Sequence, residues 1–401
     1  MTALLRPRLA SLVVLLAARS AFGQGLMAPH PLGRIVAQTS EPLGSVTAIR
    51  VLSTGQVLVS DAQDHRLLLL DSLLQHPVAV ADSGGAAARR YGKGPGTLFA
   101  LPGDTTLFFD ATSYGFLLVD PAGSIGRVIA VPRPADLLDL TNAAYGKPAI
   151  DSHGRLFYAL APRGPSPSAS AADVPDLAPI VRADLVTRVQ DTLAYQKIAR
   201  TTAPAVVRDS TGQVAGLRQT INPLPVGDDW TLAADGSLAV IRAHDYHVDW
   251  VRADGSHDKS PPLPYEWLRL TDSDKVQLVD SVKAATAARA KAQAAMAQRT
   301  GAPASSQTTP DVLAPADLPD YRPPFRGHTA IPDAVGNVWL RTTRPLDTAG
   351  GTVYDVVSNH GVLIDRIEIQ KGFALVGFDP HHAYMTIREG SSIILVKTLL
   401  R

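Results

Sequence analysis

The 401-residue sequence contains no cysteine. Disulfide bonds, thiol catalysis, cysteine-ligated zinc sites and the acylated cysteine of a bacterial lipoprotein are therefore excluded. A chain of this length without disulfides depends on its core for stability, and a hydrophobic content of 45% is sufficient to build one.

The sequence also lacks the short motifs of several enzyme classes. It has no G-x-S-x-G elbow, no P-loop, no H-E-x-x-H zinc motif, no dinucleotide-binding fingerprint and no D-x-D-x-D calcium loop. Neither sign of charge is in excess, because 38 lysines and arginines face 37 aspartates and glutamates. This balance predicts no nucleic-acid partner.

The first 23 residues have the pattern of a secretory signal peptide. Arg6 and Arg8 precede the short apolar run Leu9–Ala18, and the small residues Ala21–Gly23 follow. The run is too short to span a bilayer, and no other apolar run approaches that length, so we predict no membrane span. We predict cleavage into a mature chain of residues 24–401 with a periplasmic or extracellular location in a bacterium. The alternative is a buried N-terminal helix.

The sequence does contain a strand-rich unit that recurs. An apolar strand, a tight polar turn and further apolar strands follow one another in Gly55–Asp71, Asp104–Asp120, Gly236–Gly255 and Gly336–Val357. The first turn recurs at six places, near Gly55, Asp104, Gly154, Gly236, Gly336 and His382. A four-stranded blade needs roughly 40–50 residues. The repetition therefore predicts an all-β fold, a six-bladed β-propeller in a single domain.

The intervals after Gly154 and Gly236 are longer than one blade and must contain insertions. Residues 161–179, rich in proline, serine and alanine, predict a mobile loop in the third unit. The segment Arg200–Thr220 predicts further irregular chain.

A second insertion, at about residues 267–326, is predicted between blades four and five. It contains the helix signal Thr271–Thr300, in which Thr271 can cap the helix and early aspartates favour its positive end. An apolar stripe is predicted in the first half of this helix, formed by Val276, Leu278, Val279 and Val282. The following tract, Gly301–Pro319, resembles a linker.

The sixth unit has only three strands before the chain ends, at Phe373–Phe378, Ala383–Arg388 and Ser392–Leu399. The segment Gly33–Ser40 belongs to no other unit and can supply the fourth. We predict that this N-terminal strand closes the last blade, because pairing the two ends removes two open sheet edges. The alternative is that Gly33–Ser40 is an unstructured leader.

The segment Arg90–Gly96 (RYGKGPG), followed by an apolar strand, a G-D-T turn and a strand ending in FFD, resembles a junction in a known family. That family is the secreted bacterial six-bladed β-propellers of the NHL/TolB-like type. Trp230–Gly255 and Asn337–Arg366 resemble its fourth and fifth blades, although Thr97 and Leu98 replace the Glu and aromatic residue usual at the junction. The resemblance covers most of the chain from Gly33 and implies the architecture, but no particular activity.

Charged residues close the second strand in five of the units. The acids Asp61 and Asp110 do so in units one and two, and arginines do so in units four to six, namely Arg242, Arg341 and Arg388. In a propeller these positions share one rim near the mouth of the central channel. We predict a polar funnel there with an acidic and a basic side, suited to carboxylate, phosphate or sugar groups. The alternative is that these charges pair with one another or cap blade turns.

Two histidines are added to this predicted ligand site. His244 lies in the polar cluster Arg242–Asp249, and His328 precedes the inner strand of unit five, where it could face the channel. The two histidines and two aspartates of the cluster could in principle bind a metal. Strand alternation places His247 and Asp249 on one face, and no second ligand pair at metal spacing follows, so we interpret the cluster as a turn followed by a surface strand. We predict no metal, cofactor or catalytic residue.

The sequence thus predicts a secreted, monomeric binding scaffold rather than an enzyme. Its partner would be a small molecule, glycan, peptide or protein held at the funnel. The alternative function is a metal-dependent propeller hydrolase or lyase of the lactonase type, which would need metal ligands on inner strands such as Ala48–Leu52 and Ala330–Ala334. A third possibility is that the helix Thr271–Thr300 docks a partner.

Overall fold

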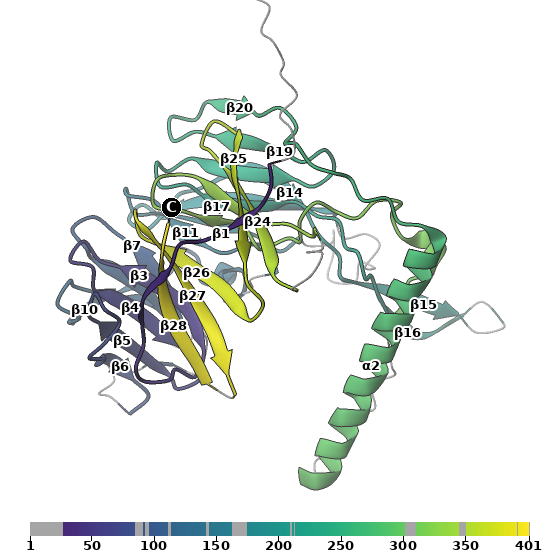
Figure 1. Cartoon of the computed structure of the whole chain (residues 1–401), viewed down its shortest axis with the longest axis horizontal. Coiled ribbons are helices and arrows are strands. Elements are labelled where there is room, and N and C mark those ends of the chain that lie inside the picture. The colour runs from purple at the N-terminus through teal and green to yellow at the C-terminus, as the bar shows by residue number, and fades with distance from the viewer. Residues whose placement is uncertain are drawn as a thin grey trace, which may run out of the picture.

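The computed structural model describes the chain from residue 27 to residue 400 with internal gaps. The described residues are 27–84, 91–92, 96–110, 114–141, 144–162, 175–208, 211, 213–300, 310–344, 350–390 and 392–400. The predicted signal peptide lies outside them, as does most of the predicted loop 161–179. Six sheets follow one another around a ring and a long helix projects from it (Figure 1). The predicted six-bladed propeller is confirmed.

Each of the first five blades contains an antiparallel meander of four consecutive strands. The sixth blade has three consecutive strands and a fourth from the N-terminal segment. Blade one is β3 (Val46–Val51), β4 (Val57–Asp61), β5 (Arg66–Leu70) and β6 (Val78–Asp82). Blade two is β7 (Thr97–Ala100), β8 (Thr106–Asp110), β9 (Gly115–Val119) and β10 (Ile125–Ala130). Blade three is β11 (Ala149–Ile150), β12 (Arg155–Ala159), β13 (Leu177–Asp184) and β14 (Gln190–Lys197).

The other half of the ring repeats this path. Blade four is β17 (Asp229–Leu232), β18 (Leu238–Arg242), β19 (His247–Val251) and β20 (His257–Lys259). Blade five is β22 (Ile331–Pro332), β23 (Val338–Arg341), β24 (Thr352–Val357) and β25 (Leu363–Ile369). Blade six begins with β26 (Phe373–Phe378), β27 (His382–Glu389) and β28 (Ser392–Leu399). The first strands of blades six, one, two, three, four and five contact one another in that order, so they surround the axis.

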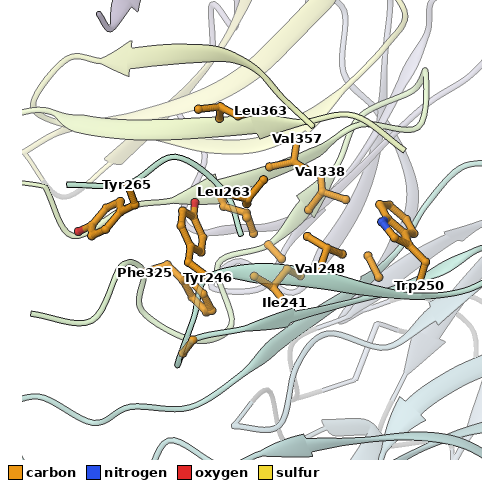
Figure 2. Close-up of a cluster of buried hydrophobic side chains, with 14 of the residues drawn as sticks. Ile241, Tyr246, Val248, Trp250, Leu263, Tyr265, Phe325, Val338, Val357 and Leu363 are labelled. Carbon is orange, nitrogen blue, oxygen red and sulfur yellow. The ribbon is translucent and has the colours of Figure 1, made fainter. Parts of the chain in front are cut away.

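Apolar side chains on the two faces of each sheet pack against the neighbouring blades. In β8, Phe108 packs with blade one, whereas Leu107 and Phe109 pack with blade three. The described residues form six such clusters, one for each pair of neighbouring blades, including blades six and one. Figure 2 shows the cluster between blades four and five, where Tyr246 and Val357 take part. Full burial of one such side chain stabilises the folded state by about 1.5–3 kcal/mol. The apolar blade interfaces therefore supply a large part of the stability of the ring.

The N-terminal segment closes the ring as predicted. Strand β2 (Ile35–Gln38) pairs antiparallel with β28, the last strand of the chain, and becomes the outermost strand of blade six. A feature that the sequence analysis did not predict precedes it. The two-residue strand β1 (His30–Pro31) pairs in parallel with β25 and adds a fifth strand to blade five. The N-terminus therefore ties blade five to blade six before it closes the ring.

The junction between blades one and two explains the glycine at its end. The Tyr91 hydroxyl, which is buried, shares a hydrogen bond of 2.8 Å with Ser60 Oγ and accepts one of 2.9 Å from the Gly96 N–H. A Cβ atom on Gly96 would lie 2.1 Å from Phe108 Cε2, so only glycine fits. Residues 93–95 of the predicted inter-blade turn lie outside the described part of the chain.

The insertion between blades four and five contains the predicted helix. Helix α2 spans Asp272–Thr300, and Thr271 caps it, since its Oγ1 accepts a hydrogen bond of 3.2 Å from the Asp274 N–H. One residue of the predicted apolar stripe is misplaced: Val276 is 45% exposed, whereas Lys275 is buried. The Lys275 ammonium donates to the Leu318 carbonyl at 3.1 Å and to Asp320 at 2.7 Å, which makes its burial possible.

The segment predicted as irregular chain, Arg200–Thr220, is instead a β-hairpin. Strand β15 (Thr202–Arg208) pairs antiparallel with β16 (Val214–Ile221), and β21 (Asp311–Val312), which follows the helix, joins β16 in parallel. The prediction of irregular chain was wrong because the turn-rich composition masks the pattern of two paired strands. The hairpin forms its own small sheet outside the ring. In the described part of the chain, the other helices are the short α1 (Leu137–Thr141) and two 3₁₀ turns, Pro134–Asp136 and Pro315–Asp317. Within the described residues, no helix has the length and apolar character that a membrane crossing requires.

Candidate functional site at the mouth of the central channel

One face of the ring carries the starts of the first strands and the ends of the second strands. Val46, which begins β3, pairs with Asp61, which ends β4. Asp229, which begins β17, pairs with Ile241, the neighbour of the terminal Arg242 of β18. Because the blades repeat one up-and-down path, the inner strands begin at this same face in each of them. We call this face the channel mouth.

The predicted site residue Asp61 is engaged within blade one. Its side chain is 0% exposed. The carboxylate accepts hydrogen bonds of 3.0 Å from the Gly44 N–H and 2.8 Å from the Ser45 N–H, and forms an ion pair of 3.1 Å with Arg66. The carboxylate thereby fixes the chain that leads into the inner strand of the blade.

Arg242 is engaged in a comparable way in blade four. Its Nη1 contacts Asp228 at 2.7 Å and its Nε contacts Asp249 at 2.7 Å. Burial lowers the pKa of Arg242, but the bonds to Asp249 and Asp228 outweigh this and raise it. The guanidinium is therefore charged and holds the residue before β17 to the end of β18.

The other predicted site residues differ in their accessibility. Asp110 ends β8 and is buried, whereas His244 is exposed in the turn between β18 and β19. Arg341, at the end of β23, and Arg388, near the end of β27, are exposed. The acids of the predicted funnel are therefore withdrawn from solvent, and arginines of blades five and six remain accessible.

Asp229 joins blade four to blade five at the mouth. Its side chain is 1% exposed, and one carboxylate oxygen accepts hydrogen bonds of 2.7 Å from the Thr329 N–H and 2.9 Å from the Ala330 N–H. The other oxygen accepts one of 2.8 Å from the Trp230 N–H. The first residue of one inner strand thus fixes the segment that leads into the next.

His328 lies in the segment that Asp229 fixes. Phe325 bridges to Thr342 and Ile331 pairs with Trp339, so the five residues between Phe325 and Ile331 bulge out opposite only two residues of the second strand. His328 has a φ of 67° within this bulge, in the left-handed region that side chains other than glycine rarely adopt. Its Nδ1 atom is buried and has no hydrogen-bond partner among the described residues. Strained backbone and an unpartnered polar atom together mark functional positions.

Lys147, from the segment that leads into blade three, is the third ionisable residue at the mouth beside Asp229 and His328. The residue before it, Gly146, has a φ of 106°, and a Cβ there would lie 2.1 Å from Trp230 Nε1. That indole N–H donates a hydrogen bond of 2.7 Å to the Tyr145 carbonyl. Glycine is therefore required for the chain to cross closely over Trp230 just before the inner strand, where the side chain of Lys147 is exposed.

Asp229 interacts electrostatically with both Lys147 and His328, and we refer to these three residues as the mouth cluster. Burial raises the pKa of Asp229, against the opposing effect of its backbone donors and of His328. Burial lowers the pKa of His328, against the attraction of Asp229, so the imidazole is neutral near pH 7. The surrounding protein lowers the pKa of Lys147, and Asp229 opposes this. The Lys147 side chain is exposed to water at its surface, and protein atoms surround its other sides.

The mouth cluster offers chemistry of two kinds, a lysine ammonium from blade three and a neutral imidazole from the segment before blade five. Lys147 can bind an anionic group, and His328 can donate or accept a hydrogen bond. Among the described residues, no group of three or more His, Asp or Glu side chains is arranged as metal ligands. In the cluster considered for a metal, His247 instead contacts Asp245 at 2.5 Å and Asp249 at 3.0 Å.

A wider hollow of about 500 Å³ lies on the outer side of blade three. Two of its polar residues already bond to each other: Gln190 donates to the Asp136 carboxylate at 3.0 Å, which also accepts a hydrogen bond of 2.7 Å from the buried Tyr158 hydroxyl. The hollow is bounded at Pro162 and Pro175, beyond which the chain lies outside the described residues. The channel mouth is therefore the better candidate site.

Sequence reasoning identified one of the three residues of the mouth cluster. It assigned His328 from its place before an inner strand, but it did not apply the same rule to Lys147 or Asp229. Both lie near the start of the first strand in their units, in the segments YGKPAI and GDDWTL. The signal that could have found them is an ionisable residue at or shortly before the start of the first strand in consecutive blades.

Solved structures similar to this chain are six-bladed propeller proteins. A DUF4221 family member from Bacteroides vulgatus is 8% identical, with a TM-score of 0.48 over 92% of this chain and 99% of that chain. An inactive virginiamycin B lyase from Staphylococcus aureus with quinupristin is 11% identical, with a TM-score of 0.39 over 92% of this chain and 99% of that chain. A gluconolactonase from Xanthomonas campestris is 12% identical, with a TM-score of 0.40 over 93% of this chain and 98% of that chain.

At these identities the likeness concerns the fold alone. The sequence matches no protein-family model and no curated protein.

Proposed function

We propose that this protein is a binding scaffold that holds a small anionic ligand, with a carboxylate as the best match, at the channel mouth. The observation that carries the proposal is the mouth cluster. The starts of the first strands in blades three, four and five place Lys147, Asp229 and His328 at one face, where Trp230 bonds to Tyr145 and Asp229 to Ala330, and His328 has a strained backbone conformation. Such strain persists where the surrounding structure enforces it, which is typical of binding and catalytic sites.

Exposed cations at this face can bind an anion. Of the residues that close the second strands, Asp61 and Asp110 are buried, whereas Arg341 and Arg388 are exposed. Together with Lys147 these arginines supply accessible cations, among the exposed acids Asp64, Asp245 and Glu389. Arginine binds carboxylates through its planar fork, and lysine contributes a point charge.

The same proposal includes the cellular setting. The predicted signal peptide at residues 1–23 and the resemblance to NHL/TolB-like propellers support a secreted protein, periplasmic or extracellular, that captures its ligand outside the cytoplasm. A glycan, peptide or protein with an exposed carboxylate fits the same surface.

A hydrolase or lyase of the lactonase type is the second candidate, and one observation favours it. His328 is neutral near pH 7, and a neutral imidazole can act as a general base. Mass spectrometry of the native protein and elemental analysis distinguish the candidates. A stoichiometric metal favours the enzyme, and a co-purified organic acid favours the scaffold.

The binding proposal is tested with citrate and galacturonate as probes, by calorimetry and thermal shift. We expect Lys147→Gln to weaken binding of the better probe by about tenfold or more, because an ion pair in a confined mouth is lost. Lys259→Gln is the matched control, since Lys259 is an exposed lysine on the outer strand β20. Equal affinities of the two variants, or no binding of either probe, would count against the proposal.

A further inference from the structure

We propose that the groove between blades three and four, away from the channel mouth, binds a small tetrahedral oxyanion such as phosphate or sulfate. The groove is a hollow of about 150 Å³. Three arginines line it, Arg155, Arg182 and Arg252, together with His257. This is a concentration of basic side chains in a chain whose formal charge is only +1.

The position of the groove separates it from the mouth. Its lining includes Gly236, in the turn between β17 and β18, and Gly255, in the turn between β19 and β20. Those turns lie at the opposite ends of the strands from Asp229 and Arg242. Other lining residues, Phe157 and Val251, belong to the apolar cluster between the two blades. The groove is thus a polar opening at the end of a dry blade interface.

Each arginine of the groove is oriented by a carboxylate that lies outside the hollow. The ion pairs are Arg155–Asp151 at 2.6 Å, Arg182–Asp191 at 3.3 Å and Arg252–Asp258 at 2.6 Å. No aspartate or glutamate is among the residues that line the hollow. The hollow itself therefore presents cationic groups, although the wider surroundings are neutral.

The ion pairs leave donors for a ligand. Arg155 and Arg252 bind their carboxylates through Nε, and Arg252 donates its Nη1 to the Asn359 carbonyl at 2.9 Å. Among the described residues, both terminal nitrogens of Arg155 and the Nη2 of Arg252 make no further hydrogen bond. Arginine side chains held by carboxylates on one side are pre-organised to bind an oxyanion on the other.

The size of the hollow sets the ligand class. Its volume corresponds to about five water molecules at roughly 30 Å³ each. Pockets for drug-sized ligands start at about 300 Å³. The groove therefore fits an inorganic oxyanion, or the terminal phosphate or sulfate group of a larger molecule whose remainder stays in solvent.

The test uses inorganic phosphate and sulfate as probes, by calorimetry and by tryptophan fluorescence. Trp250 reports on the site because the Arg252 guanidinium lies 4.8 Å from the centre of its ring. Thr192 lines the hollow and is exposed, so its replacement removes no ion pair. We expect Thr192→Gln to retain binding and Thr192→Glu, which differs from it by a charge, to weaken binding by about tenfold or more.

A second pair of variants tests the arginines directly. Arg182→Gln should also weaken binding, and Arg127→Gln, at an exposed position of β10, should not. Glucose 6-phosphate shows whether the ligand is a free ion or a group on a larger molecule. If it binds as tightly as phosphate, the site accepts a phosphate group on a larger molecule. If it binds far more weakly, the site takes the free ion. No binding of phosphate or sulfate at millimolar concentrations, or equal affinities of Thr192→Glu and Thr192→Gln, would overturn the proposal.

Discussion

Asp355 and Arg366 form an ion pair of 2.8 Å in which both side chains are 0% exposed. The second oxygen of Asp355 accepts a hydrogen bond of 2.8 Å from the Tyr246 hydroxyl of blade four. The Arg366 Nη2 donates to the Pro264 carbonyl at 2.6 Å, and its Nη1 donates to the Met27 carbonyl at 3.2 Å. A single pair in blade five thus joins the neighbouring blade, the chain that leads to the helix and the N-terminal segment.

Removal of one partner of this pair should be strongly destabilising. Arg366→Met leaves the carboxylate of Asp355 buried without its counter-ion, and we expect a loss of about 3–5 kcal/mol in the free energy of unfolding. The double variant Arg366→Met/Asp355→Leu should lose less than the sum of the two single variants, because it leaves no unpaired charge. Urea unfolding of the four proteins measures this coupling. Additive losses would show that the pair is not coupled.

Removal of the N-terminal strands should destabilise the ring in two steps. Deletion of residues 24–32 removes β1 from the outer edge of blade five together with the Met27 carbonyl that accepts from Arg366, and we expect a modest loss of stability. Deletion of residues 24–41 also removes β2, which leaves β28 unpaired along its outer edge, and should cost several kcal/mol more. Thermal melting compares the two. Equal melting temperatures for the longer deletion and the intact mature chain would contradict the closure of blade six by β2.

His328 should titrate below the ordinary histidine range. Burial lowers its pKa and the charge of Asp229 opposes this, so Asp229→Asn should lower the midpoint of His328 further. Histidine-detected NMR measures both midpoints, and His328→Gln assigns the signal. A midpoint of His328 that rises in Asp229→Asn would show that the two groups are not coupled as described.

The same shift has a consequence for stability. Between the lowered pKa of His328 and the unfolded value of about 6.5, the unfolded chain binds more protons than the folded one. Stability contributed by neutral His328 is therefore present above pH 6.5 and decreases as the pH falls through this window. Denaturant titrations at several pH values should show a smaller decrease in His328→Gln than in the unsubstituted protein.

The two arginines Arg242 and Arg341 should respond differently to truncation. Arg242→Ala leaves the nearly buried Asp228 without its partner, and because Arg242 is itself a quarter exposed we expect a loss of about 1–3 kcal/mol. Arg341→Ala, at an exposed position, should change stability by less than about 0.5 kcal/mol. Arg341 is therefore the cleaner probe of anion binding at the mouth. Urea unfolding checks both values, and equal losses would contradict this assignment.

The helical insertion should be separable from the ring. The Leu270 N–H donates to the Asp320 carbonyl at 2.8 Å, so the ends of the insertion lie side by side and an Asn-Gly turn can replace residues 271–319. None of the six blade-interface clusters contains a residue of α2. We expect the shortened protein to melt within a few degrees of the intact one. A large drop in melting temperature would show that the insertion supports the ring, and loss of a co-purifying partner would support a docking role for α2.

Several features of the fold follow from local sequence. Turn glycines such as Gly55 and Gly236, both with positive φ, recur at the spacing of a blade, and that spacing is sufficient to predict six blades. The helix signal was also local, because a capping threonine and a run of high helix propensity act within a few turns. The buried face of the helix is not determined locally, because the burial of Lys275 depends on Asp320, which lies 45 residues later in the chain.

The candidate site shows the limit of such reasoning. The sequence analysis predicted Asp61 and Arg242 on the rim. The Asp61 carboxylate accepts from the Gly44 N–H, and the Arg242 guanidinium pairs with Asp228, so partners of both side chains come from other segments. Whether a charged group is exposed depends on these partners and not on its place in the repeat. The hairpin at residues 202–221 was missed for a different reason, because its turn-rich composition resembles irregular chain, and β21 after the helix adds a third strand to it.

The class of the fold, the number of blades, the N-terminal closure and the place of the helix can all be predicted from the order of the residues. Those features follow from periodic apolar patterns and turn residues, which act over a few neighbours. Which charges are buried and which remain accessible depends instead on tertiary contacts. The tertiary structure also determined that Lys147, Asp229 and His328 meet at one mouth, and that three arginines from two blades line one groove. These relationships depend on contacts between residues far apart in the chain, which ring closure alone brings together.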